Sequence, residues 1–319
     1  MSPQPTIKLS SGYEMPLFGL GTWQSKPGEV ANAVEIALNL GYRHLDCAFA
    51  YQNQDEIGAV LKKIFAEGKI KREDVFITSK VWNTFHSYNK ATENINTILK
   101  ELQLEYIDLL LIHWPTGYEE GSDIFPKNAD GSKMRYSNED YIDTWKALED
   151  AQKAGKVRSI GISNFNHKQI ERLWAAANIK PSVHQVELNP YFTQKKLRDF
   201  CAAKNIAITA YSPLGNPGSS FFRKAGDPNI LENQVVLDIA KKHNKTAAQV
   251  ILRWFIELQI IVIPKSVSEN RLKENFDIFD FSLTKEEVDA IEGLNKNWRL
   301  VDTTFRDSDH PHFPFNEEF

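Results

Sequence analysis

The sequence has few cysteines and no surplus of basic residues, and each shortage excludes a class of protein. Cys47 and Cys201 are the two cysteines, which allow at most one disulfide and give no metal-ligand spacing. We therefore expect two core thiols in a reducing compartment and no metal site. The 38 basic residues are outnumbered by 42 acidic ones, which argues against nucleic acid as a partner.

Membrane and secretion signals are also missing. Residues 1–16 contain no basic segment followed by an apolar run, so no secretory signal is indicated. No stretch approaches the ~20 continuous apolar residues that a spanning helix needs. We therefore expect a soluble, cytoplasmic protein without a membrane partner.

A glycine-rich dinucleotide fingerprint is absent as well. Gly19 and Gly21 are followed neither by the third glycine of that motif nor by an immediate helix start, which disfavours a doubly wound sheet. The length of 319 residues suits one α/β barrel, and we expect a single domain over residues 1–319.

Strand and helix patterns alternate along the chain after a short hairpin at 7–9 and 15–18. The expected strands are 18–22, 44–48, 75–79, 106–113, 157–162, 183–187, 206–211 and 260–263. Helical periodicity is expected at 29–40, 55–65, 91–102, 141–154, 168–177, 195–204 and from Thr246, where Thr-Ala-Ala-Gln has a capping-box spacing. Eight strands that alternate with helices predict an α/β fold, a (β/α)8 TIM barrel with an amino-terminal β-hairpin.

Three segments are too long to be simple connections. Residues 115–138 and 213–232 form two long loops, and a tail begins at Asn297. Loops of this length in a compact domain are usually functional, so we expect them over the site.

Polar or aromatic residues stand at the end of every expected strand, and in a barrel these ends meet at one rim. In strand order they are Trp23, Asp46, Lys80, His113, Ser163 with Asn164, Gln185, Tyr211 with Ser212, and Lys265 with Ser266. Each one alone has a structural interpretation, such as a buried histidine or a surface ion pair. Together, at one rim, they indicate a site.

Asp46, Tyr51, Lys80 and His113 can form a proton-donating group. A tyrosine pKa near ~10 makes a poor acid at neutral pH. We expect the Lys80 ammonium to lower that pKa, with Asp46 holding the lysine charged and His113 orienting a carbonyl oxygen. Such a group suits protonation of a carbonyl as hydride arrives, and hydride implies a nicotinamide or flavin.

The segment 263–271 carries Lys265, Ser266, Ser268 and Arg271 around an expected helix start. Cations and exposed amides favour an anion there, although a solvated helix start is an equally simple interpretation. Because arginine binds phosphate through two hydrogen bonds, the 2′-phosphate of NADP is the favoured ligand.

These residues resemble the aldo-keto reductases, and within them the aldose and aldehyde reductase group. The matching blocks run nearly end to end: MPLFGLGTW, GYRHLDCAFAY, TSKVWN, YIDLLLIHWP, GISNFN, AYSPLG, IPKS and PFNEEF. The resemblance implies a barrel with an amino-terminal hairpin. It further implies a monomeric oxidoreductase that uses NADPH to reduce small-molecule aldehydes and ketones to alcohols.

The resemblance also implies roles for individual residues. Tyr51 would be the general acid, tuned by Lys80 and Asp46, with His113 orienting the carbonyl. The implied cofactor residues are Ser163, Asn164 and Gln185 on the carboxamide, Tyr211 on the ring, Ser212, Leu214 and Lys265 on the pyrophosphate, Lys265, Ser266 and Arg271 on the 2′-phosphate, Glu274 and Asn275 on the adenine, and Gly21, Thr22, Trp23, Asp46 and Val267 nearby. The implied substrate pocket holds Trp23, Tyr51, Trp82, His113, Trp114, Phe125 and Trp298, which favours apolar or amphipathic carbonyls.

Departures from the group leave the substrate open. The tail after Trp298 and the aromatic position Phe221 differ from aldose reductase, whereas Val267 favours NADPH over dual cofactor use. Two alternatives remain. One is a Schiff-base aldolase that uses Lys80 or Lys265 as nucleophile. The other is a non-enzymatic NADPH-binding protein, because the resembling family includes lens crystallins and channel-associated subunits.

Overall fold

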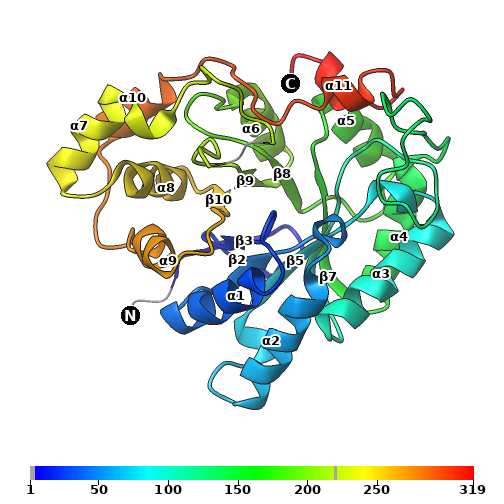
Figure 1. Cartoon of the computed structure of the whole chain (residues 1–319). Coiled ribbons are helices and arrows are strands. Elements are labelled where there is room, and N and C mark those ends of the chain that lie inside the picture. Colours follow the sequence, from blue (N-terminus) through cyan, green and yellow to red (C-terminus); the bar gives the residue numbers. More distant parts are fainter. Residues whose placement is uncertain (1–3, 219–220) are drawn as a thin grey trace.

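The computed structural model describes residues 4–218 and 221–319, and parallel strands form its centre (Figure 1). The eight-stranded sheet has the order β10-β9-β8-β7-β6-β5-β4-β3. The strands are Leu20–Gly21 (β3), His44–Asp46 (β4), Phe76–Val81 (β5), Ile107–Ile112 (β6), Val157–Ser163 (β7), Val183–Glu187 (β8), Ala207–Tyr211 (β9) and Ile261–Val262 (β10). Parallel bridges Phe18↔Val262 and Gly21↔Lys265 join the first strand to the last, so the sheet closes. The predicted (β/α)8 barrel is confirmed.

The first and last strands are shorter than predicted. β3 and β10 have two residues each, against expected ranges of 18–22 and 260–263. The residues that flank β3 and β10 form only isolated β-bridges, Phe18↔Val262 and Gly21↔Lys265, because the two strands overlap little where they close the barrel.

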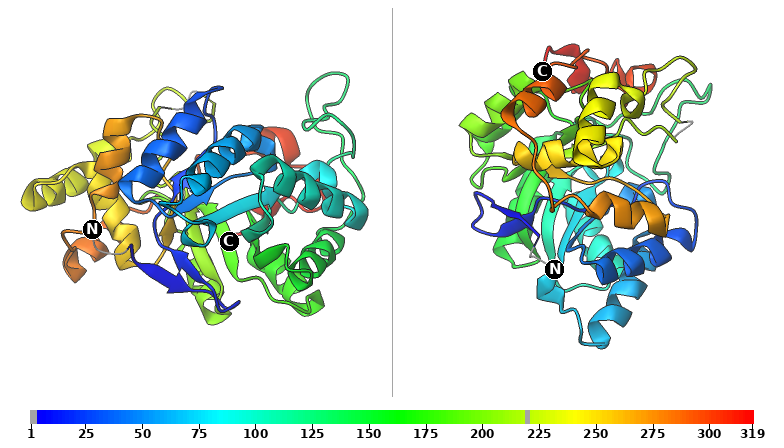
Figure 2. Two further views of the ribbon diagram at one scale, coloured as in Figure 1. Left: turned by 90° about the horizontal axis from the view of Figure 1, so that it is seen from below. Right: turned by 90° about the vertical axis from the view of Figure 1, so that its left-hand side faces the viewer.

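Helices surround the barrel (Figure 2). They are Glu29–Leu40 (α1), Gln54–Ala66 (α2), Tyr88–Leu102 (α3), Tyr141–Lys153 (α4), His167–Ala176 (α5), Lys195–Ala203 (α6), Gln234–His243 (α7), Ala247–Glu257 (α8), Glu269–Phe276 (α9), Lys285–Glu292 (α10) and Thr304–Asp307 (α11). The capping box expected at Thr246 is present, since its side chain accepts the N–H of Gln249 and the Gln249 side chain accepts the N–H of Thr246. Helices α7, α10 and α11 lie outside the predicted strand–helix units.

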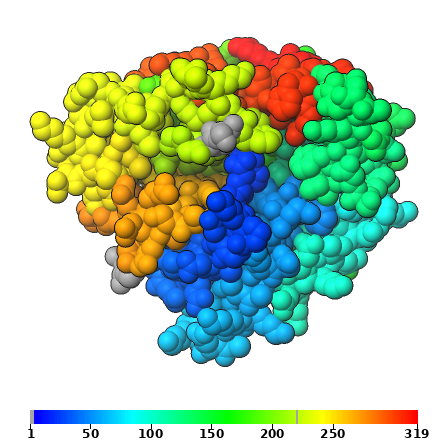
Figure 3. Space-filling view, viewed as in Figure 1, coloured from blue at the N-terminus to red at the C-terminus, as the bar shows by residue number. Residues whose placement is uncertain are grey.

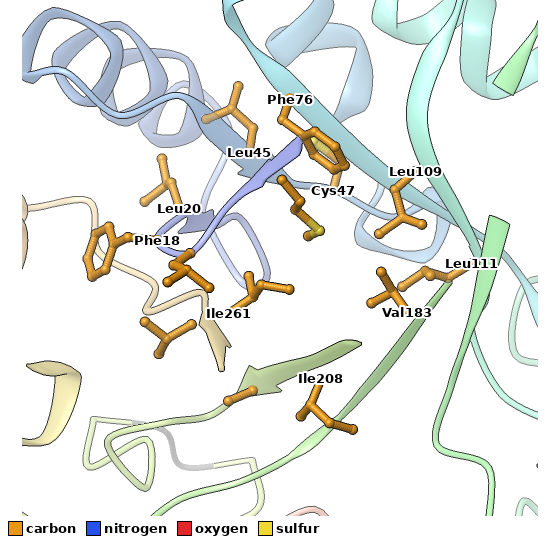
Figure 4. Close-up of a cluster of buried hydrophobic side chains, with 14 of the residues drawn as sticks. Phe18, Leu20, Leu45, Cys47, Phe76, Leu109, Leu111, Val183, Ile208 and Ile261 are labelled. Atoms are coloured by element: carbon orange, nitrogen blue, oxygen red, sulfur yellow. The ribbon is translucent and has the colours of Figure 1, made fainter. Parts of the chain in front are cut away.

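Apolar strand residues fill the barrel interior. Figure 4 shows Leu45, Phe76, Leu109 and Ile208 among the side chains that gather there, with Cys47 beside them. Cys47 and the second cysteine, Cys201, are both buried and free, as the expectation of core thiols required. Strands buried on both faces explain the nearly continuous apolar run at β6.

The predicted hairpin covers one end of the barrel. Its strands are Thr6–Lys8 (β1) and Glu14–Pro16 (β2), paired antiparallel. The turn between them reaches the starts of two barrel strands, because Ser10 Oγ lies 3.1 Å from Ser182 Oγ and Ser11 Oγ lies 2.7 Å from Ser159 Oγ. This end is opposite the carboxyl ends of the strands.

The long loops and the tail meet at the other end. Figure 3 shows the red carboxyl-terminal tail against the green first long loop, with the yellow-green second long loop beside them. Tyr118 of the first loop donates its hydroxyl to Asp307 of the tail at 2.9 Å, and the N–H of Gly117 donates to His310 Nε2 at 3.2 Å. Within the described ranges, every helix is too short or too polar to span a bilayer.

Candidate active site

A buried ion pair lies at the rim where β4 and β5 end. Lys80 Nζ donates to Asp46 Oδ2 at 2.7 Å and to the carbonyl of Cys47 at 2.8 Å, and it lies 3.4 Å from the Tyr51 hydroxyl. The Lys80 side chain is 0% exposed and that of Asp46 is 2% exposed. An ammonium has three N–H donors, so these contacts use all of them. The second carboxylate oxygen of Asp46 accepts an N–H of Gln185 at 2.7 Å.

Tyr51 follows β4 on a short 3-10 turn, Phe49–Tyr51. We expected Lys80 to lower the pKa of this phenol, and that expectation was wrong in direction. Burial raises the pKa of Tyr51 well above its usual value, and the negative charge of Asp46 adds to the rise. Asp46 neutralises the lysine next to the phenol, and little water remains to solvate a phenolate. Tyr51 therefore keeps its proton at neutral pH and can donate it.

His113 follows β6 and faces Tyr51 across the rim. The two rings meet edge to face with centroids 5.8 Å apart, and the Trp82 ring lies 5.1 Å from the imidazole. Burial, followed by the charges of Lys80 and Arg306, lowers the pKa of His113 well below its usual value. The imidazole is therefore neutral at physiological pH and carries one N–H that can donate to an oxygen.

An amide network lies on the neighbouring strands β7, β8 and β9. Ser163 Oγ donates to the carbonyl of Gln185 at 2.8 Å. Asn164 Nδ2 donates to the carbonyl of His113 at 3.0 Å, and Asn164 Oδ1 accepts the hydroxyl of Tyr211 at 2.7 Å. Asn164 adopts φ 63°, a left-handed conformation that is costly for most residues and is common at functional sites. The structure thus brings Ser163, Asn164, Gln185 and Tyr211 together beside the ion pair.

A second group of predicted residues lies where β3 and β10 meet. Gly21 bridges to Lys265, the Thr22 hydroxyl donates to the carbonyl of Asp46 at 2.8 Å, and Lys265 Nζ donates to the carbonyl of Gln24 at 3.1 Å. Burial lowers the pKa of Lys265, and the nearby positive charge of Arg271 lowers it further against the opposing effect of Glu29. Two cations therefore lie close enough together to affect each other.

These cations stand at the start of α9. Ser268 caps the helix by accepting the N–H of Arg271, and Ser266 Oγ accepts the N–H of Ser268 at 3.1 Å. Lys265 and Arg271 are exposed, so both can reach an anion in solvent. The other predicted residues of this group are Leu214, Val267, Ser212, Glu274 and Asn275. Leu214 and Val267 are half-buried and Asn275 is buried, and Ser212 has φ 49°. The Glu274 carboxylate accepts the Thr246 hydroxyl at 2.8 Å.

Aromatic side chains surround the rim above His113. Trp82 packs on Phe125 with centroids 5.3 Å apart, and Trp23 packs on Phe222 at 5.9 Å. A buried apolar cluster consists of Trp82, Trp114, Tyr118, Met134, Leu300 and Val301, with Phe222 and Trp298 packed against it. Phe125 is 37% exposed and lies at the outer edge of this group. Trp82, Trp114 and Trp298 therefore gather in one cluster beside His113, with Phe125 at its edge and Trp23 joined to it through Phe222.

A model of the aldo/keto reductase family matches residues 17–296 of the chain. The protein belongs to the aldo-keto reductase family. Aldo-keto reductase family 1 member A1 of Xenopus tropicalis is 45% identical over 320 residues, which cover 98% of this chain and 97% of that protein. The mouse (Mus musculus) member A1 is 44% identical over 323 residues, covering 98% and 99%.

A solved structure, the aldose reductase from Schistosoma japonicum, matches with a TM-score of 0.92 and 41% identity, covering 99% of this chain and 100% of that one. These relatives support an oxidoreductase that acts on carbonyl groups, and members of the family generally use nicotinamide cofactors.

The rim of this aldo-keto reductase fits a nicotinamide cofactor. Asn164 and Gln185 present side-chain amides that can pair with a carboxamide, and both are buried beside the ion pair. Exposed Lys265 and Arg271 supply positive charge at a helix start, where the phosphates of a dinucleotide can bind.

Sequence reasoning marked the tail after Trp298 as a departure that bears on the substrate, but it assigned no position in the site to several residues of the tail and of the second long loop. Leu300 and Val301 of the tail join the aromatic cluster, and Phe222 packs on Trp23. Arg306 of the tail lies over the Tyr118 ring at 5.7 Å and pairs with Asp307, with Nη2 2.8 Å from Oδ2. No local signal could have found these residues, because their place depends on how the tail folds back across the barrel.

Proposed function

We propose that this protein is an NADPH-dependent reductase that converts aldehydes and ketones to alcohols, with Tyr51 as the proton donor. The observation that carries the proposal is the position of the Tyr51 hydroxyl 3.4 Å from Lys80 Nζ, which itself lies 2.7 Å from Asp46 Oδ2. A protonated phenol beside a charged, fixed ammonium is suited to release its proton only when a strongly basic oxygen forms next to it.

When bound, the cofactor supplies hydride to the carbonyl carbon. The substrate oxygen gains negative charge as this happens, and the neutral His113 imidazole and the Tyr51 phenol can both donate to it. The phenol proton then moves from Tyr51 Oη to that oxygen, which completes the alcohol. Lys80 stabilises the phenolate that remains until solvent returns the proton.

We assign the cofactor residues by their chemistry. Ser163, Asn164 and Gln185 would hold the carboxamide, and Tyr211 would stack on the nicotinamide ring. Exposed Lys265 and Arg271, with Ser266, favour a 2′-phosphate and therefore NADPH. The remaining residues proposed to line the cofactor are Gly21, Thr22, Trp23, Ser212, Leu214, Val267, Glu274 and Asn275.

The aromatic pocket supports an apolar or amphipathic carbonyl substrate. Trp23, Trp82, Trp114, Phe125 and Trp298 offer large apolar faces around the proposed donors. In keeping with the resemblance to the family, we further propose that the enzyme works as a cytoplasmic monomer on a small molecule, with neither nucleic acid nor membrane as partner.

The test follows NADPH absorbance with a panel of aldehydes and ketones, with NADH in parallel, for wild type, Tyr51→Phe and Tyr42→Phe. Tyr42 is a control for the loss of a buried tyrosine hydroxyl, because its hydroxyl donates to the carbonyl of Leu272 on α9 at 2.9 Å and not to a proposed proton donor. We expect Tyr51→Phe to lower kcat by roughly 10²-fold or more while NADPH still binds, and Tyr42→Phe to leave kcat unchanged.

Other outcomes point to the alternatives. A folded wild type that binds NADPH without turnover would indicate a binding or structural role. Borohydride trapping of a substrate on a lysine would instead indicate a Schiff-base aldolase.

A further inference from the structure

Strand β8 holds the carboxyl-terminal tail through one buried carboxylate. Glu187 ends this strand and is 1% exposed. Its Oε1 accepts the N–H of Leu300 at 2.8 Å, and its Oε2 accepts the N–H of Val301 at 2.7 Å. Two adjacent backbone donors of the tail thus bind the two oxygens of one side chain.

The residues held in this way belong to the apolar cluster that contains two residues of the proposed substrate pocket. Leu300 and Val301 are 4% and 6% exposed and pack in one cluster with Trp82 and Trp114. Their side chains therefore form part of the apolar surface above His113. The position of this surface depends on where the backbone of residues 300–301 is held.

The same strand carries a residue of the buried ion-pair network. Gln185 and Glu187 are two apart on β8, so their side chains leave the strand on the same face. Gln185 donates to Asp46 at 2.7 Å, whereas Glu187 binds the tail one step further toward the rim. Strand β8 therefore fixes the distance between the proposed proton donors and the tail.

We propose that Glu187 is a positioning residue that sets substrate specificity by holding residues 300–301 against the aromatic pocket. The proposal rests on the reductase function proposed above. It assigns Glu187 no contact with the reacting atoms, and it predicts that loss of the anchor loosens the wall of the pocket while the ion pair and the cofactor residues stay in place.

A carboxylate suits this position better than any other side chain. Each of its two oxygens can accept a hydrogen bond from one backbone N–H group, whereas glutamine would turn an NH₂ group toward one of these two donors. Arg299, whose guanidinium stacks on Phe315 at 3.6 Å, supplies positive charge nearby. Burial raises the pKa of Glu187, and the two N–H donors and Arg299 oppose that rise.

The test compares Glu187→Gln with Glu149→Gln. Glu149 is a matched control, because it is also buried, at 2% exposed, and its Oε1 accepts the backbone N–H groups of Asn178 at 2.6 Å and Ile179 at 2.8 Å. It lies on α4, and Asn178 and Ile179 belong to the segment after α5, not to the tail. Both variants replace a buried carboxylate with an amide, at different places. In Glu149→Gln the amide oxygen can still accept both backbone N–H groups, and only the bond from Asn178 Nδ2 to Oε2, at 3.1 Å, is lost.

We expect Glu187→Gln to raise KM for a bulky aromatic aldehyde roughly tenfold, with a much smaller change for a short aliphatic aldehyde, for NADPH and for kcat. Glu149→Gln should lower the melting temperature by a smaller amount and leave all KM values unchanged. Glu187→Asp keeps both acceptor oxygens, and it should restore part of the preference for the bulky substrate.

A second readout does not require turnover. Arg299 and Arg306 flank the anchored residues, so trypsin should cut the tail at these sites faster in Glu187→Gln than in wild type or Glu149→Gln. If trypsin cuts all three proteins at the same rate, or if the two glutamine variants shift substrate preference equally, the proposal is overturned. Faster cleavage in a protein without reductase turnover would instead support the anchor and reject the proposed function.

Discussion

Lys80 and Asp46 form an ion pair in which Nζ lies 2.7 Å from Oδ2, with both side chains buried, and the Tyr51 hydroxyl lies 3.4 Å from the same nitrogen. Removing two charges from water is costly, and the cost is offset only when each charge has its partners. Here the ammonium has three acceptors, and the carboxylate accepts from Lys80 and Gln185.

Lys80→Met should therefore affect both activity and stability. It leaves the Asp46 carboxylate buried without its counter-charge, and we expect a loss of about 3–5 kcal/mol in the free energy of unfolding. We also expect kcat to fall by roughly 10²-fold, because the phenolate of Tyr51 loses its stabilising charge. Urea unfolding and NADPH turnover measure the two effects.

The double variant Asp46→Asn with Lys80→Met is the control for this interpretation. Since it removes both charges, it should be more stable than Lys80→Met alone. If the double variant instead loses as much stability as Asp46→Asn and Lys80→Met lose together when measured singly, the two residues are not coupled.

Arg271→Met should weaken the use of NADPH but not the use of NADH. Arg271 is exposed at the start of α9, where it lies close enough to Lys265 to affect its pKa. If Arg271 binds a 2′-phosphate, its loss should raise KM for NADPH by roughly 10- to 100-fold and leave KM for NADH unchanged. Lys273→Met on the same helix, whose ammonium pairs with Glu269 at 2.6 Å, should change neither value. Equal effects on both cofactors would place the phosphate elsewhere.

Gly58→Ala should destabilise the fold without touching the site. A Cβ at Gly58 would stand 2.2 Å from the carbonyl oxygen of Glu101, at the contact of α2 with α3. Backbone cannot move aside as a flexible side chain can, so we expect a loss of about 2–4 kcal/mol and a lower melting temperature. Gly121→Ala meets no atom within 4 Å and serves as the control. An unchanged melting temperature for Gly58→Ala would contradict the close packing of these helices.

Glu287 should make stability depend on pH in the acid range. Burial opposes its ionisation, but hydrogen bonds from Lys242, from the N–H of Thr284 and from His243 outweigh burial and lower its pKa from 4.5 to about 2. A lowered pKa means that the stabilisation is complete above about pH 4.5 and is lost as pH falls toward about 2. Because Lys242 is largely exposed, we expect about 1–2 kcal/mol.

Glu287→Gln should remove this part of the acid sensitivity, as measured by urea unfolding at several pH values between 2 and 6. Glu171→Gln, at an exposed site on α5, should leave the pH profile unchanged. If Glu287→Gln and wild type lose stability in parallel through this range, the ion pairs of Glu287 do not determine it.

Much of the fold and of the candidate site could be predicted because it depends on local pattern. Strand β6 is nearly all apolar since it is buried on both faces, and the capping box at Thr246 starts a helix through bonds within one turn. The convergence of Asp46, Lys80 and His113 followed from counting parallel strands, whose carboxyl ends meet at one rim.

Other features were decided only by tertiary structure. The amino-acid sequence by itself determined which groups stand at the rim, but burial decided that the pKa of Tyr51 rises. The contacts of Glu187 with Leu300 and Val301 join residues more than 110 positions apart, and no periodicity in the sequence encodes them. Desolvation and long-range hydrogen bonds depend on which atoms of distant segments surround a group. Those neighbours are determined only when the chain has folded.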